Sequence, residues 1–154
     1  MIAPRYPSAA VRLALVREAP GISRSRVTIH NARAAYEAVA PVLSGLAHER
    51  FVALLLDPRK RLLSVVNVAD GGLASCQVDP RVLFGAALVG GASSVIVAHC
   101  HPSGDPSPSA DDVDLTRALV AAGRTLCLPI LDHLIIGDGE FVSLAQYQPQ
   151  LFGL

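Results

Sequence analysis

The feature that most constrains the fold of this chain is the segment from His99 to Asp112, which follows the short apolar run Ser94–Ala98. A short run rich in β-branched residues is typical of a buried strand. Because side chains at i and i+2 of a strand lie on one face, His99 and His101 should point the same way, and Cys100 should point to the opposite face. A turn rich in proline, glycine and serine follows, and a helical pattern with three carboxylates then begins. The segment therefore predicts two imidazoles at a strand end beside a carboxylate in the first turn of a helix.

The chemistry of these side chains favours a metal site. Two histidines and one carboxylate, with a fourth position open for water, form a ligand set of catalytic zinc. A metal site is not the only interpretation, because histidines at a strand end can also be structural or solvated. Ser109 and Asp112 also have the spacing of a helix capping box, in which serine is the N-cap and an acid follows at N3. Capping and metal ligation do not exclude each other, so both interpretations are kept.

The spacing of His99-x-His101, seven residues, and then Ser109-x-x-Asp112 resembles the JAMM motif of JAB/MPN-domain metalloproteases. The longer string from His99 to Asp112 resembles the RadC branch of that group. This branch usually has asparagine where the present chain has Cys100. Because strand alternation turns Cys100 away from the metal, we interpret it as a small buried residue and not as a thiolate ligand.

Two further segments carry the same resemblance, so that it covers roughly residues 25–145. The segment 49–57 is similar to an early strand of the family, and 131–144 is similar to its closing strands. The resemblance implies an α/β fold with a single JAB/MPN-like, cytidine-deaminase-like domain, in which helices flank a curved mixed β-sheet. On this interpretation residues 1–24 form a basic N-terminal arm and residues 25–154 form the catalytic domain.

The resemblance also implies a role for each candidate site residue. His99, His101 and Asp112 would bind Zn²⁺, Glu49 would act as the general base, and Ser109 would stabilise the oxyanion. The residues alone support Glu49 weakly, because without the resemblance it would be interpreted as an exposed carboxylate at a strand end.

The function expected from this resemblance is zinc-dependent hydrolysis of a peptide or isopeptide bond, with a peptide or protein as substrate. Two alternatives remain: a DNA-repair-associated protein that binds or cleaves nucleic acid, and a non-catalytic MPN scaffold. Zero net charge and 5% aromatic residues speak against nucleic-acid binding. Longer RadC proteins carry a helix-hairpin-helix module that we do not expect in this chain, so a DNA role based on that module does not transfer.

Composition and charge give a general frame. A chain of 154 residues fits one domain, and 51% hydrophobic residues with few aromatics predict a core of leucine, valine, isoleucine and alanine. The charge is unevenly distributed, because residues 1–33 hold six arginines and one acid. We interpret the basic segment as a solvated arm. A docking arm for an acidic partner, or a linker left from a larger architecture, is the alternative.

The expected location is the cytoplasm. Cys76, Cys100 and Cys127 form no C-x-x-C pair and suit a reducing compartment. Arginines interrupt the apolar residues near the N-terminus, which argues against a signal peptide. The longest uncharged stretch, Val82–Ala98, is broken by glycines and is shorter than the roughly 20 apolar residues of a membrane span. We therefore expect no membrane contact, and the sequence does not assign an oligomeric state.

Periodicity and turn residues predict the remaining elements. Strands are expected at 26–29, 50–56, 62–68, 73–78, 94–98, 128–136 and 140–144. Helices are expected from Asn31 to about Leu46, from Asp79 to Gly90, and from Ser109 onward; Pro41 should kink or divide the first of these. Leu115, Leu119, Ala122 and Leu126 should form the core-facing stripe of the last helix. His133, in an apolar strand, is interpreted as a core histidine or one that supports a ligand, and Asp105 as a turn residue.

Overall fold

A computed structural model describes residues 27–71 and 78–153 of the chain. The helices of this part are α1 (Ala32–Leu43), α2 (Pro80–Val89), α3 (Ala110–Thr125), α4 (Leu144–Tyr147) and the 3₁₀ turn η1 (Pro149–Leu151). The strands are β1 (Arg50–Leu56), β2 (Leu62–Asp70), β3 (Ser94–Cys100), β4 (Ile130–Ile136) and β5 (Phe141–Ser143). The α/β class and the single domain expected from the sequence are confirmed.

The strands form one open, mixed sheet in the order β2-β1-β3-β4-β5. β1 pairs antiparallel with both β2 and β3, and β4 pairs antiparallel with β5. β3 and β4 are parallel, and α3 forms the crossover between them. The carboxyl end of β3, which carries the two histidines of the motif, therefore lies in the middle of the sheet.

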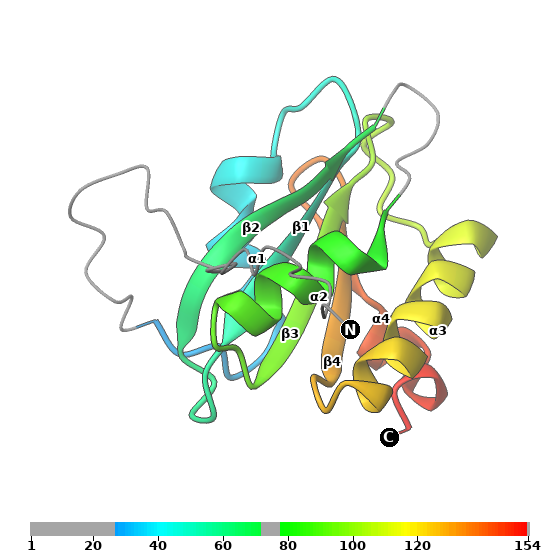
Figure 1. Cartoon of the computed structure of the whole chain (residues 1–154). Coiled ribbons are helices and arrows are strands. Elements are labelled where there is room, and N and C mark those ends of the chain that lie inside the picture. The colour runs from blue at the N-terminus through cyan, green and yellow to red at the C-terminus, as the bar shows by residue number, and fades with distance from the viewer. Residues whose placement is uncertain (1–26, 72–77, 154) are drawn as a thin grey trace, which may run out of the picture.

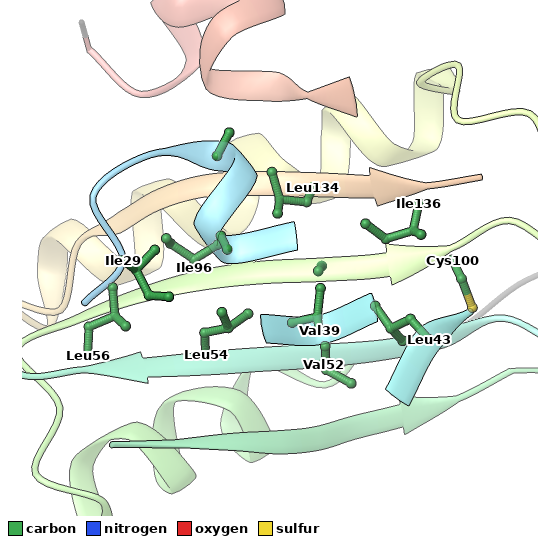
Figure 2. Packing of buried hydrophobic residues seen from close by; sticks show 13 residues of the cluster. Ile29, Val39, Leu43, Val52, Leu54, Leu56, Ile96, Cys100, Leu134 and Ile136 are labelled. Carbon is green, nitrogen blue, oxygen red and sulfur yellow. The ribbon is translucent and has the colours of Figure 1, made fainter. Parts of the chain in front are cut away.

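Helices cover both faces of the sheet, with α1 on one face and α2 and α3 on the other (Figure 1). Strand alternation decides which residues meet which helices. Val52, Leu54 and Leu56 of β1 pack under α1, whereas Phe51 and Leu55 face α2 and α3. In β3 the even-numbered residues share the α1 side, as Figure 2 shows for Ile96 and Cys100 beside Val39 and Leu43 of α1.

Each of the three longer helices begins after a residue whose side chain caps its first turn. Asn31 caps α1 by accepting from the main-chain N–H of Ala34, and Asp79 caps α2 with Pro80 at the first helical position. Pro41 does not divide α1. It lies in the last turn, and the helix ends two residues later at Leu43, which is earlier than expected.

Other differences from the predicted elements are local. Of the predicted strand 26–29, only an isolated bridge between Thr28 and Arg61 is present. The predicted strand 73–78 lies outside the described residues except for its last residue, and so does the basic arm 1–24. No helix in the described ranges is long and apolar enough to cross a membrane.

The stripe predicted for α3 is only partly right. Leu119 is fully buried, but Leu126 follows the helix as its C-cap and is 43% exposed. The buried face of α3 consists of Thr116, Leu119, Val120 and Gly123. Gly123 is required there, because a Cβ atom would overlap the main-chain oxygen of Leu128 where the helix packs closely on the following segment.

Candidate metal centre

The structure brings together the three side chains that the motif predicts as metal ligands. His99 is the last residue but one of β3, His101 directly follows the strand, and Asp112 lies in the first turn of α3. The Nε2 atoms of the two histidines are 2.9 Å apart. Asp112 Oδ1 lies 3.0 Å from His99 Nε2, and Asp112 Oδ2 lies 3.4 Å from His101 Nε2. The side chains are only 5, 15 and 12% exposed for His99, His101 and Asp112, so their polar atoms face one another in a partly enclosed site.

Strand geometry sets the position of His99. Residue 99 pairs with Phe51 of β1, and the two rings stack with centroids 6.0 Å apart on the α2/α3 face of the sheet. Cys100 points to the opposite face and is buried in the α1 cluster, as expected (Figure 2). Its Sγ lies 3.6 Å from the main-chain oxygen of His48, and burial raises the pKa of the thiol. Cys100 therefore does not contribute to the histidine cluster.

A capping box sets the position of Asp112. Ser109 Oγ accepts from the main-chain N–H of Asp112 at 3.1 Å, and Asp112 Oδ2 accepts from the main-chain N–H of Ser109 at 2.8 Å. The Ser109 hydroxyl also donates to Asp112 Oδ2 at 2.6 Å. The capping interpretation of this pair is confirmed, and the same contacts aim the carboxylate at the two imidazoles.

The loop after β3 orients His101. His101 Nδ1 lies 2.8 Å from the main-chain oxygen of Asp105, which can only accept, so Nδ1 carries the proton. The carboxylate of Asp105 instead accepts from the N–H of Ser107, as a turn residue does. Asp105 thus orients His101 through its main chain.

His99 is held by a buried partner from the neighbouring strand. His99 Nδ1 lies 2.8 Å from His133 Nε2, and His133 Nδ1 lies 2.6 Å from Thr116 Oγ1. His133 is completely buried, which lowers its pKa well below the usual value for histidine. His133 is thus a buried core histidine that is hydrogen-bonded to a candidate ligand, as the sequence predicted. Sequence reasoning missed Thr116, although its position one helical turn after Asp112 was a usable signal.

The donor set fits a divalent cation. Two imidazole nitrogens and a carboxylate offer ligand atoms that all lie within 4.8 Å of one another. Burial opposes ionisation of Asp112, but hydrogen bonds from His101 and His99 outweigh it, and the pKa of Asp112 is strongly lowered. The hydrogen bond with Asp112 raises the pKa of His101 against the opposing effect of burial. Once both imidazoles have lost the proton at Nε2, two nitrogen lone pairs and a carboxylate oxygen face one another, and zinc accepts this combination of ligands.

Glu49 lies next to this group, immediately before β1. Continuing the antiparallel register that pairs Phe51 with His99 places residue 49 opposite His101. The negative charge of Glu49 contributes to the raised pKa of His101. Among the described residues the Glu49 carboxylate has no hydrogen bond or ion pair, and Glu49 is partly exposed. Its general-base role remains a prediction.

Comparison with known proteins gives consistent matches. A model of the RadC-like JAB domain family matches residues 29–149. A UPF0758 protein of Symbiobacterium thermophilum is 41% identical over 121 residues, which are 79% of this chain and 52% of the relative. UPF0758 proteins of Moorella thermoacetica and Methanosarcina mazei are 40% identical over 134 residues and 44% identical over 109 residues. The matches cover 87% and 71% of this chain, and 58% and 48% of the relatives. The chain therefore spans about half the length of these curated relatives, and their names state no activity.

Proposed function

The chain belongs to the RadC-like JAB domain family, and from this membership we propose that it is a zinc-dependent hydrolase that cleaves a peptide or isopeptide bond. The observation that carries the proposal is the convergence of His99, His101 and Asp112, whose ligand atoms lie within 4.8 Å of one another. JAB/MPN enzymes characteristically hydrolyse such bonds, and the motif of this chain resembles the motif of those enzymes. We propose this reaction for the domain described above. That a peptide or protein is the substrate of the whole protein is part of the same proposal.

Zinc in this site would supply Lewis acidity to an attacking water and to the scissile carbonyl. Glu49 would accept the proton of that water and return it to the leaving amine, which is the work of a general acid–base residue. Its position opposite His101 and its lack of another partner among the described residues support this role.

Ser109 would donate a hydrogen bond to the developing oxyanion. In the structure its hydroxyl proton is directed to Asp112 Oδ2. The proton must therefore rotate away from the carboxylate to reach a substrate, which is easier once a cation shares the charge of Asp112. Oxyanion donors of this kind are worth about 3 kcal/mol in other enzymes.

A cavity adjoins His101 on the α1 side of the sheet, where Cys100 and Ile136 also line it. This cavity of about 210 Å³ is lined by His101, by the loop from Pro102 to Gly104, and by Leu43–Leu46 at the end of α1. Because it adjoins a ligand histidine, a side chain of a bound peptide could occupy it. The cavity is small, which suits a segment of extended chain more than a folded surface.

The nucleic-acid alternative receives little support from the described residues. Of the eight lysine and arginine residues in the described ranges, four form an ion pair with a nearby aspartate: Arg50, Arg61, Arg81 and Arg117. Paired arginines contribute less to binding phosphates, which depends on unneutralised positive charge. We therefore retain the hydrolase as the proposed function.

The first experiment measures metal. Elemental analysis of purified protein should find about one zinc per chain in the wild type and little in His101→Ala. His30→Ala is the matched control, because His30 is exposed and lies outside the cluster. A wild-type protein that retains no zinc after zinc has been supplied and excess removed would contradict the proposed function.

The second experiment tests Glu49. Zinc-loaded Glu49→Gln should lose about 10²- to 10⁴-fold in the rate of hydrolysis of fluorogenic peptides and lysine-linked isopeptides, because the proton acceptor is gone. Its zinc content should equal that of the wild type. Glu37→Gln, on the exposed side of α1, should behave like the wild type. Undiminished hydrolysis by Glu49→Gln would show that another group accepts the proton.

A further inference from the structure

A chain of buried hydrogen bonds connects two of the candidate metal ligands, His99 and Asp112, on the side that faces away from the metal position. It runs from His99 Nδ1 to His133 Nε2 over 2.8 Å, and from His133 Nδ1 to Thr116 Oγ1 over 2.6 Å. Thr116 Oγ1 then donates to the main-chain oxygen of Asp112 over 2.6 Å. The chain thus connects β3, β4 and α3, and it begins and ends on residues that carry metal ligands.

The direction of each hydrogen bond follows from the last acceptor. A carbonyl oxygen has no proton to give, so the single hydroxyl proton of Thr116 points to Asp112. The Thr116 oxygen must then accept, which places a proton on His133 Nδ1. His133 is completely buried between His99 and Thr116 and has no carboxylate partner among these contacts, so its ring is neutral and Nε2 carries a lone pair.

The same reasoning assigns the proton of His99. Because His133 Nε2 can only accept, His99 Nδ1 carries a proton, and the lone pair of a neutral His99 is on Nε2. That atom faces His101 and Asp112. With the opposite polarity His99 Nε2 would carry the proton and could not bind a metal ion.

We propose that His133 and Thr116 are positioning residues that hold His99 in its metal-binding tautomer and tie it to the helical turn that carries Asp112. His101 achieves the same result more simply, through the carbonyl of Asp105. The proposal rests on the metal-binding part of the proposed function, since a tautomer matters here only if His99 is a ligand. Partners that orient ligand histidines commonly decide metal affinity in this way.

The proton assignment is tested first by NMR on the metal-free wild type. Long-range ¹H–¹⁵N spectra should place the proton of His99 on Nδ1 and that of His133 on Nδ1. A ¹⁵N–¹⁵N coupling across the hydrogen bond should connect His99 Nδ1 with His133 Nε2. A proton on His133 Nε2 would overturn the proposal. Because no metal is present, this result does not depend on the proposed function.

Removal of the Thr116 hydroxyl tests the consequence for metal binding. Thr116→Val keeps the shape but leaves His133 Nδ1 without an acceptor, so the ring is free to adopt the other tautomer. Affinity for zinc, measured by competition with a chelator, should fall about 10- to 100-fold. Thr116→Ser restores the hydroxyl and should restore both the affinity and the ¹⁵N–¹⁵N coupling.

Thr125→Val is the matched control, because the Thr125 hydroxyl also donates to a carbonyl of α3 but lies on the exposed side. Thermal unfolding of each metal-free variant shows whether the variant is folded. A folded variant with reduced zinc affinity has therefore lost the metal-binding tautomer of His99 and not its fold. If Thr116→Val does not fold, the NMR assignment of the wild type and of Thr116→Ser still decides the proposal. If folded Thr116→Val binds zinc with the affinity of the wild type, the positioning role of Thr116 and His133 is overturned. If the wild type shows the expected coupling but binds no zinc, the proposed function is contradicted and the proton assignment still holds.

Discussion

At the scale of single residues, each candidate ligand of the metal centre is oriented by a contact on its far side. His101 contacts the carbonyl of Asp105, and His99 contacts His133. Asp112 is held by the main-chain N–H of Ser109. These contacts leave Nε2 of each histidine and the Asp112 carboxylate facing one another, so that a cation could replace the protons shared between them.

The pH dependence of zinc binding follows from His101. The hydrogen bond with Asp112 raises the pKa of His101 above 6.5, whereas the pKa of Asp112 is lowered and this carboxylate stays ionised near neutrality. A proton must therefore leave His101 before zinc binds, and the apparent affinity should rise about tenfold per pH unit below the pKa of His101 and level off above it. Chelator competition between about pH 5.5 and 8.5 measures this slope. An affinity that does not change over this range would mean that His101 is already neutral in the metal-free protein.

At the scale of elements, main-chain hydrogen bonds connect the loop after β3 with the end of β4 and the turn that follows it. The N–H of His101 donates to Ile136, and the N–H of Asp138 donates to the main-chain oxygen of Gly104. Gly137 lies so close to this loop that a Cβ atom would overlap the oxygen of Gly104 and the ring of Pro106. The absence of a side chain at this position therefore allows the loop to present the Asp105 carbonyl to His101.

Gly137→Ala tests this packing. The added methyl group has no space between two main-chain segments, so the variant should be less stable by about 1–3 kcal/mol in urea unfolding. Its zinc affinity should also fall, because the loop that orients His101 must move. The control is Gly85→Ala, whose new methyl group meets open space on α2. This control should be as stable as the wild type or up to about 1 kcal/mol more stable. Equal stability of both variants would show that the loop yields without cost.

At the scale of the whole molecule, the candidate metal ligands come from parts of the fold that the chain itself connects only through a long loop. His99 belongs to the central strand β3, whereas Asp112 belongs to α3, which lies on one face of the sheet. A cation bound by both would link the sheet directly to this helix. Metal binding should therefore stabilise the folded domain as a whole.

Zinc should raise the temperature of unfolding. At a free zinc concentration of 100 times Kd the stabilisation is about 2.7 kcal/mol. For a chain of this size this corresponds to roughly 5–10 °C. Calorimetry with and without a chelator measures the shift, which should be absent in His101→Ala and unchanged in His30→Ala. A shift of the same size in His101→Ala would locate the zinc elsewhere.

The local features of this protein can be predicted from the sequence alone, because strand alternation, turn residues and helix caps depend on neighbours along the chain. These rules place His99 and His101 on the face opposite Cys100, and they begin α3 at Ser109 with Asp112 in its first turn. The three candidate ligands could therefore be named before the fold was known. Glu49 could be named only through the family resemblance, because nothing local indicated which strand β1 would pair with.

The tertiary structure alone decided which distant segments meet. The pairing of β1 with β3 places Glu49 opposite His101, and the parallel pairing of β3 with β4 places His133 beside His99. The core-facing side of α3 was predicted only in part, because it depends on how the helix packs on the sheet: Thr116 is buried, whereas Leu126 lies after the helix as its C-cap and is exposed. Contacts between residues far apart in the chain arise from strand order and helix packing, and no periodicity within one segment specifies either.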